Sequence, residues 1–187
     1  MSASSPFSPA RPLIGFAAYS GTGKTTLICQ LIPLLKQRGL RIAVIKHAHH
    51  TFEIDHPGKD SFELRKAGAA QTLVASRKRW ALIVDEDREQ EPEVAALLER
   101  LDLESIDLVL VEGFKRAELP KIELHRQAHR RPLQCLADSS IVAVASDAPL
   151  PAGVTLPRLD LNDPGDIVRF ICEHIVGIQD RDDAGTG

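Results

Sequence analysis

Residues 18–26 have the composition and spacing of a phosphate-binding P-loop. Ala18 takes the place of the usual first glycine, and Gly23, Lys24 and Thr25 complete the motif. Glycines let backbone N–H groups converge on phosphate oxygens, and a helix beginning after the loop adds partial positive charge. Lys24 would then neutralise the β- and γ-phosphates, and the Thr25 hydroxyl would ligate Mg²⁺. We predict that Lys24 is also catalytic and that phosphates bind Ser20, Gly21, Thr22, Gly23, Lys24, Thr25 and Thr26.

A second magnesium ligand is expected at the end of an apolar stretch. Residues 108–111 are all aliphatic and are followed by Glu112 and Gly113. Mg²⁺ prefers oxygen ligands, often one carboxylate together with phosphates and water. We therefore predict that Glu112 holds the metal together with Thr25, either directly or through a water molecule.

The polar segment 47–59 carries further candidates, since loops of this length are often functional. His47 and His49 are compatible with a metal site, with a nucleotide or partner contact, or with packing, and we include His49 among the nucleotide-binding residues. Asp55 and Asp60 are candidates to hold a metal-bound water or to orient an attacking water. We favour Asp60 as catalytic, although residues 60–63 also form a capping-box pattern that would begin a helix.

A P-loop binds phosphates and cannot distinguish one base from another, so base recognition must come from a different loop. Asp147 follows the apolar stretch 141–145, and a carboxylate can accept both adjacent N–H donors of guanine. The alternative is that Asp147 only begins the turn before Pro149. Ser76, within 75–77, is the next candidate for reading guanine.

Strands and helices must position these residues at one edge of a sheet. Apolar runs predict strands at 12–18, 40–45, 106–111, 121–125 and 141–145. Helical periodicity and capping signals predict helices at 24–38, 60–68, 92–101 and 164–176. Two further runs, 71–75 and 80–84, predict a hairpin. The alternation indicates an α/β, P-loop NTPase-like fold: a largely parallel sheet flanked by helices, with an antiparallel hairpin extension.

The composition indicates a globular protein and disfavours two classes. The chain has 187 residues, of which 43% are hydrophobic and 26% charged. A formal charge of -3 disfavours a general nucleic-acid binder, and 4% aromatic residues argue against a base-stacking single-strand binder. Three widely spaced cysteines and the lack of a long apolar run point to a cytoplasmic protein. We expect one P-loop domain over 11–177, between disordered segments at 1–10 and 178–187.

Several motifs together resemble the MobB family of molybdopterin-guanine dinucleotide biosynthesis adapter proteins, from about residue 12 to 176. The resemblance implies GTP binding with Mg²⁺, weak GTPase activity, a homodimer, and association with MobA, the guanylyltransferase that joins GMP to molybdopterin. It leaves direct binding of molybdopterin open. Ala48 departs from the threonine that is common in the family. The motifs that carry the resemblance are residues 17–26, 45–50, 57–61, 63–71, 79–82, 110–115 and 143–147.

Two other functions use the same motif and are kept as alternatives. One is a small-molecule kinase, for which the acidic segment 85–93 would make a poor lid because it repels phosphates. The other is a dimeric adapter that binds GTP without hydrolysing it. Two basic clusters, 77–79 and the basic residues of 125–131, are either solvated loops or attract a pterin phosphate or an acidic face of MobA.

Overall fold

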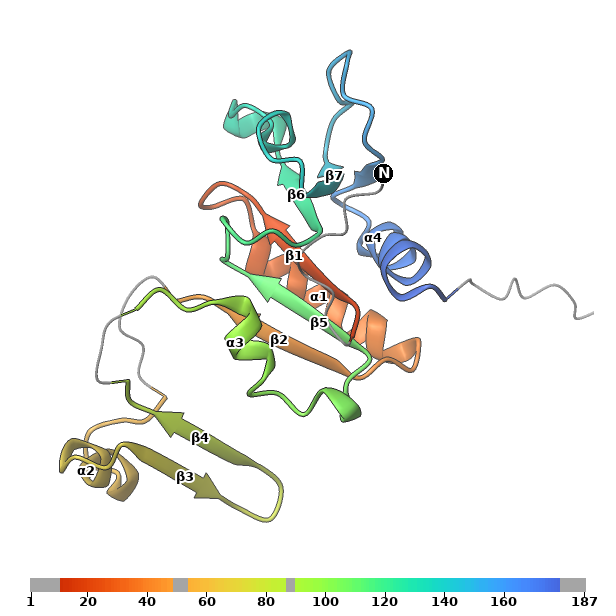
Figure 1. Cartoon of the computed structure of the whole chain (residues 1–187). Helices are drawn as coiled ribbons and strands as arrows, with labels where there is room; N and C mark the ends of the chain where they lie inside the picture. The colour runs from red at the N-terminus through yellow and green to blue at the C-terminus, as the bar shows by residue number, and fades with distance from the viewer. Residues whose placement is uncertain (1–10, 49–53, 87–89, 179–187) are drawn as a thin grey trace, which may run out of the picture. The chain divides into compact units, whose positions relative to one another are not determined.

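The computed structural model describes residues 11–48, 54–86 and 90–178 (Figure 1). The chain divides into two compact units, which we call the larger unit (1–47 with 93–187) and the smaller unit (48–92). The terminal segments predicted to be disordered lie almost wholly outside the described residues.

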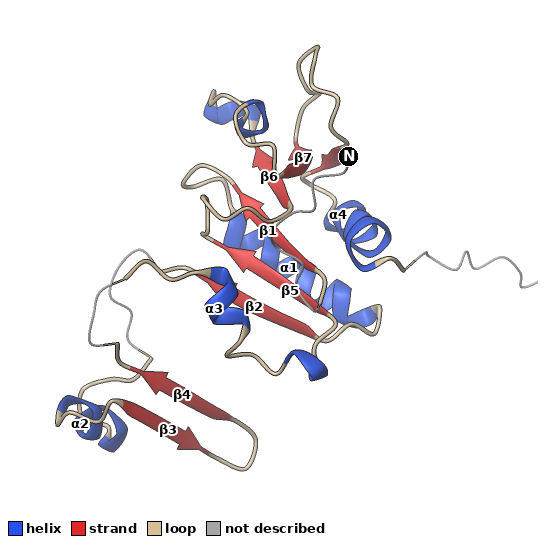
Figure 2. Cartoon of the chain, in the orientation of Figure 1, coloured by secondary structure: helices blue, strands red, loops and turns tan. Residues whose placement is uncertain are grey.

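A six-stranded parallel sheet forms the centre of the larger unit (Figure 2). Its order is β2-β5-β1-β6-β7-β8, so the chain crosses over between neighbouring strands, as the predicted α/β fold requires. The predicted strands are confirmed, and β8 is an additional one. The bounds are β1 (Leu13–Ala17), β2 (Ile42–Lys46), β5 (Leu108–Glu112), β6 (Lys121–His125), β7 (Ile141–Ser146) and β8 (Arg158–Asp160).

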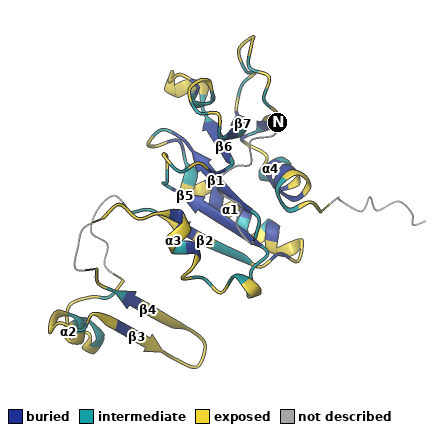
Figure 3. Ribbon diagram, viewed as in Figure 1, coloured by how far each residue is buried: buried dark blue, intermediate teal, exposed yellow. Residues whose placement is uncertain are grey.

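Helices cover both faces of this sheet. Helices α1 (Lys24–Gln37) and α4 (Pro164–Phe170), the latter continuing as a π-helical turn at Ile171–Val176, pack on one face. The short helix α3 (Val94–Leu98) packs on the other. Pro92 was predicted to open this helix, but Glu93 is its extended N-cap residue and Pro92 lies outside it. Figure 3 shows that the central strands are the most buried part of this unit.

Parallel pairing fixes where the functional residues can lie. Glu112 at the end of β5 pairs in register with Phe16 of β1 on one side and with Lys46 of β2 on the other. Strand β6 pairs parallel with β1, and β7 pairs parallel with β6. The segments after β1, β5, β6 and β7 therefore leave the sheet at the same edge, which is where open α/β sheets bind ligands.

The smaller unit contains helix α2 (Asp60–Lys66) and the predicted hairpin of β3 (Gln71–Ala75) and β4 (Trp80–Val84). The hairpin forms a two-stranded sheet of its own and is not an edge of the parallel sheet. The capping-box prediction is wrong, because Lys59 is the N-cap residue of α2 and its side chain makes no capping hydrogen bond. Asp60 is instead the first residue of the helix.

Candidate functional site

The loop between β1 and α1 has the backbone shape of a phosphate-binding loop. Gly21 and Gly23 have φ angles of 81° and 97°, a left-handed conformation that other residues rarely adopt. Gly23 is also the N-cap residue of α1, and among the described residues no side-chain hydrogen bond caps the start of that helix. Thr22 is buried and its hydroxyl donates to the Tyr19 carbonyl oxygen at 2.8 Å, which holds the loop closed. The first N–H groups of α1 are therefore available to an anion.

Lys24 begins α1 and turns back toward this loop. Its Nζ donates to the carbonyl oxygen of Ala18 at 3.3 Å. Burial lowers the pKa of the Lys24 ammonium, an effect that the Glu112 carboxylate opposes and the charge of Lys115 reinforces. A phosphate oxygen placed over the loop would give this cation a stronger partner than a carbonyl oxygen does.

Thr25 and Glu112 meet across the phosphate loop. The Thr25 hydroxyl donates to Oε1 of Glu112 at 2.6 Å, although the residues are 87 positions apart. Glu112 is buried, and Nζ of Lys46 lies 3.8 Å from its Oε2. The structure thus brings together the two residues predicted as metal ligands. A hydroxyl and a carboxylate are hard oxygen donors and fit Mg²⁺.

Gly113, which follows Glu112 directly, lies close against His47. Its φ of 95° is left-handed, and a Cβ built there would lie 3.0 Å from Cβ of His47 and 3.1 Å from its carbonyl oxygen. The His47 N–H donates to the Glu112 carbonyl oxygen at 2.8 Å. The His47 ring packs against Phe114, with the ring centroids 5.1 Å apart. Of the alternatives for this histidine pair, the structure thus gives His47 a packing contact. His49 lies outside the described residues.

Two predicted site residues, Asp60 and Ser76, belong to the smaller unit. Asp60 opens α2, as described above. The Ser76 hydroxyl donates to the Arg79 carbonyl oxygen at 3.0 Å and accepts from the Arg79 N–H at 3.2 Å, so it organises the hairpin turn. Their roles in catalysis and base recognition stay predictions.

Asp147, the residue predicted to read guanine, already has partners for both carboxylate oxygens. Oδ1 accepts the backbone N–H of Gln127 at 2.9 Å, and Oδ2 lies 3.6 Å from the Arg126 guanidinium. Arg126 in turn donates from Nε to the Thr22 carbonyl oxygen at 3.3 Å. Asp147 is therefore linked to the phosphate loop through Arg126, and its role in reading guanine stays a prediction.

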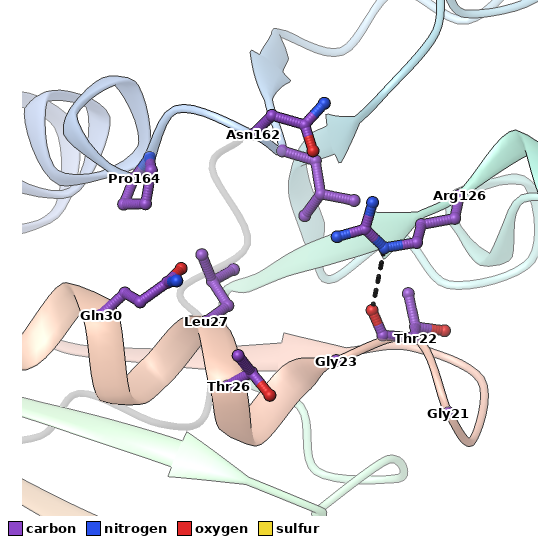
Figure 4. A pocket seen from close by; sticks show the side chains of 10 residues that line it. Gly21, Thr22, Gly23, Thr26, Leu27, Gln30, Arg126, Asn162 and Pro164 are labelled. Atoms are coloured by element: carbon purple, nitrogen blue, oxygen red, sulfur yellow. Dashed lines mark hydrogen bonds between the residues drawn. The ribbon is translucent and has the colours of Figure 1, made fainter.

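A cavity of about 430 Å³ lies beside the phosphate loop (Figure 4). Loop residues 21–23 and the first turns of α1 form one side, and residues following β6 and β8 form the other. From the sequence, Arg126 was considered only as part of a basic cluster, and four other side chains that line the cavity were not identified as site residues. The one available signal was the position of Asn162 after a strand, but β8 is three residues long and was not predicted. The four side chains are Leu27, Gln30, Leu161 and Asn162.

The described residues contain neither a cluster of metal-ligating side chains nor a helix that could span a membrane. No group of three or more His, Cys, Asp or Glu side chains among them is placed to hold a metal ion. Within the same residues, no helix is both long enough and apolar enough to cross a membrane.

The parallel sheet, the glycine loop between β1 and α1, and a carboxylate at the end of the adjacent strand define a P-loop NTPase-like protein. The chain belongs to the MobB family, because the sequence model of the family "Molybdopterin guanine dinucleotide synthesis protein B" matches residues 13–147. A molybdopterin-guanine dinucleotide biosynthesis adapter protein of Escherichia coli is 52% identical over 87% of this chain and 92% of the relative. The protein of the same name from Haemophilus influenzae is 43% identical over 86% of this chain and 87% of its own.

Solved structures agree with this assignment. A crystal structure of molybdopterin-guanine biosynthesis protein B has a TM-score of 0.68 at 28% identity and covers 86% of this chain and 97% of its own. The structure of Bacillus subtilis MobB has a TM-score of 0.69 at 24% identity and covers 89% of this chain and 99% of its own. At this identity it supports the fold alone.

Proposed function

We propose that this chain is an adapter protein in the synthesis of molybdopterin guanine dinucleotide, and that it binds GTP with Mg²⁺ and hydrolyses it weakly. Family membership and the names of its relatives support the biosynthetic role. The observation that carries nucleotide binding is the 2.6 Å hydrogen bond between Thr25 and Glu112 beside the Lys24 ammonium. It brings a hydroxyl, a carboxylate and a cation together at the mouth of the phosphate loop, which supports the proposal.

Each of these groups has a separate task in binding. The N–H groups at the start of α1 would bind phosphate oxygens, and Lys24 would neutralise the terminal phosphates. Thr25 and Glu112 would hold Mg²⁺, which when bound neutralises charge between the β- and γ-phosphates. Lys46, 3.8 Å from Glu112, orients the carboxylate from the neighbouring strand.

Hydrolysis, in this proposal, is slow and secondary to the adapter role. Asp60 is the candidate that would orient the attacking water, and Lys24 would stabilise charge on the transferred phosphoryl group. We expect turnover on the order of 10⁻³ s⁻¹ or less, as for unassisted small GTPases. A protein that binds GTP without any turnover would fit the non-hydrolysing alternative.

The proposed partners are MobA, with molybdopterin as the substrate of that enzyme, and a second copy of this chain in a homodimer. The hairpin of the smaller unit offers a surface for the second copy. In the hairpin Leu73 pairs with Leu82 and Trp80 pairs with Ala75. Residues Leu73, Trp80 and Leu82 are 63%, 69% and 45% exposed. Such an apolar face is typical of an association surface. We place this assembly in the cytoplasm on the sequence grounds given above.

Isothermal titration calorimetry of the full chain with MgGTP tests the proposal. Lys24→Ala should weaken binding by at least ~1.5 kcal/mol, about tenfold, because a charged hydrogen-bond partner is lost. Lys36→Ala, an exposed lysine in the last turn of the same helix, is the matched control and should bind as the wild type does. Unchanged affinity in Lys24→Ala would refute the phosphate-loop assignment.

A reconstituted reaction tests the adapter role. Purified MobA, molybdopterin and MgGTP should give more molybdopterin guanine dinucleotide with the wild-type chain than with Lys24→Ala. If the chain alone phosphorylates a small acceptor, the kinase alternative would replace the adapter proposal.

A further inference from the structure

The cavity beside the phosphate loop lies away from the proposed metal ligands. Thr25 meets Glu112 of β5, on one side of β1, whereas Arg126 follows β6, on the other side. Residues 21–23 line the cavity directly, so a ligand whose phosphates bind the loop can extend into it. A volume of about 430 Å³ is within the range of small-molecule sites.

The Arg126 guanidinium is fixed at two points. Its Nε donates to the Thr22 carbonyl oxygen at 3.3 Å, and its NH1 lies 3.6 Å from Oδ2 of Asp147. Asp147 is itself fixed, because Oδ1 accepts the Gln127 N–H at 2.9 Å. Figure 4 shows the Arg126 side chain reaching toward the cavity, above the loop. A guanidinium held in one plane is suited to stacking on an aromatic ring.

The remaining lining combines an apolar floor with two amides. Leu27 and Leu161 are 4% exposed and supply the floor. Gln30 of α1 and Asn162 after β8 carry exposed side-chain amides, and neither amide has a hydrogen-bond partner among the described residues. The Asn162 backbone is held, since its N–H donates to Oδ1 of Asp160 at 2.8 Å. An amide offers one acceptor and two donors, which can match the polar edge of a purine.

We propose that this cavity is the subsite for the purine base, with Arg126 stacking on the base and Asn162 and Gln30 binding its edge. Asp147 is then a positioning residue that acts through Arg126 and does not itself bind guanine. The inference rests on the proposed nucleotide binding, and it reassigns base recognition from Asp147 to the cavity.

Calorimetry with two ligands, MgGTP and magnesium tripolyphosphate, separates the base from the phosphates. Arg126→Lys keeps the charge but loses the planar surface, so GTP affinity should fall about fivefold or more while tripolyphosphate affinity stays within about twofold. Asn162→Ala and Gln30→Ala should each cost GTP about fivefold, the usual effect of one lost hydrogen bond, and leave tripolyphosphate unchanged. Gln37→Ala, an exposed glutamine elsewhere on α1 that does not line this cavity, should change neither.

The role of Asp147 is tested by a double-mutant cycle. If Asp147 acts through Arg126, Asp147→Asn lowers GTP affinity in the wild type but has no further effect in Arg126→Ala. If Asp147 binds guanine directly, the same loss occurs in both backgrounds and xanthosine triphosphate binds more tightly. The second result would overturn the positioning role.

The remaining outcomes separate this inference from the proposed function. Wild-type protein that binds neither ligand would refute nucleotide binding itself. Wild-type protein that binds tripolyphosphate as tightly as GTP, with GTP affinity unchanged in the cavity variants, would overturn the base subsite and leave the phosphate loop intact. Equal losses for both ligands in Arg126→Lys would also overturn stacking, because they would mean that Arg126 acts only on the loop through Thr22.

Discussion

Glu112→Gln tests whether the carboxylate at the end of β5 serves a metal ion. The substitution keeps the shape of the side chain, and the amide oxygen can still accept the Thr25 hydroxyl, now 2.6 Å from the carboxylate. The fold should therefore survive. The loss is the negative charge that a hard divalent cation prefers, and interactions with charged groups contribute about 1.5–3 kcal/mol. Lys46, 3.8 Å away, already neutralises part of that charge. We therefore expect a loss of binding free energy at the lower end of this range, which is roughly a tenfold loss of affinity.

The assay is a calorimetric titration of GTP in excess Mg²⁺ and again in EDTA. In Mg²⁺ the variant should bind GTP roughly tenfold more weakly than the wild type. In EDTA it should bind equally well or better, because the carboxylate that repels the phosphates is gone. Asp107→Asn makes the same chemical change just before the opposite end of β5 and is the matched control, expected to bind GTP normally. Equal losses in Mg²⁺ and EDTA would show that Glu112 is structural.

The positions of the residues proposed to bind phosphate and metal could be predicted because they depend on short stretches of sequence. The loop lies between a strand and a helix that adjoin it in the chain, so β1, residues 18–23 and α1 could be recognised together. Glu112 required one more step, the rule that parallel strands end at the same edge of a sheet. The register of β1 with β5, which pairs Phe16 with Glu112, confirms that step.

The cavity was not predictable, because its walls come from distant parts of the chain. Arg126 reaches the carbonyl of Thr22 over 104 positions, and no local pattern indicates that contact. Asn162 follows β8, a strand of three residues and too short to show a periodicity of its own. Likewise, the sequence shows Asp147 after a strand but cannot show that Arg126 and the Gln127 N–H hold both its oxygens. A local motif thus predicted the glycine loop between β1 and α1, whereas the walls of the cavity depend on tertiary contacts.

Two further predictions concern association and stability. Light scattering at micromolar concentration should give the mass of a dimer for the wild type and of a monomer for Trp80→Lys, because the charge would interrupt the apolar hairpin face; a monomeric wild type would refute the dimer. The last prediction concerns Asp107, whose carboxylate accepts from Nε and NH2 of Arg41 at 3.0 Å each. These bonds lower the pKa of Asp107 from 3.8 to about 2, so the pair contributes stability above about pH 4 that is lost as the pH falls through about 2. Thermal unfolding followed by circular dichroism between about pH 5 and 2 should therefore show a smaller decline in Tm for Asp107→Asn than for the wild type. Parallel curves would mean that the pair does not couple folding to protonation.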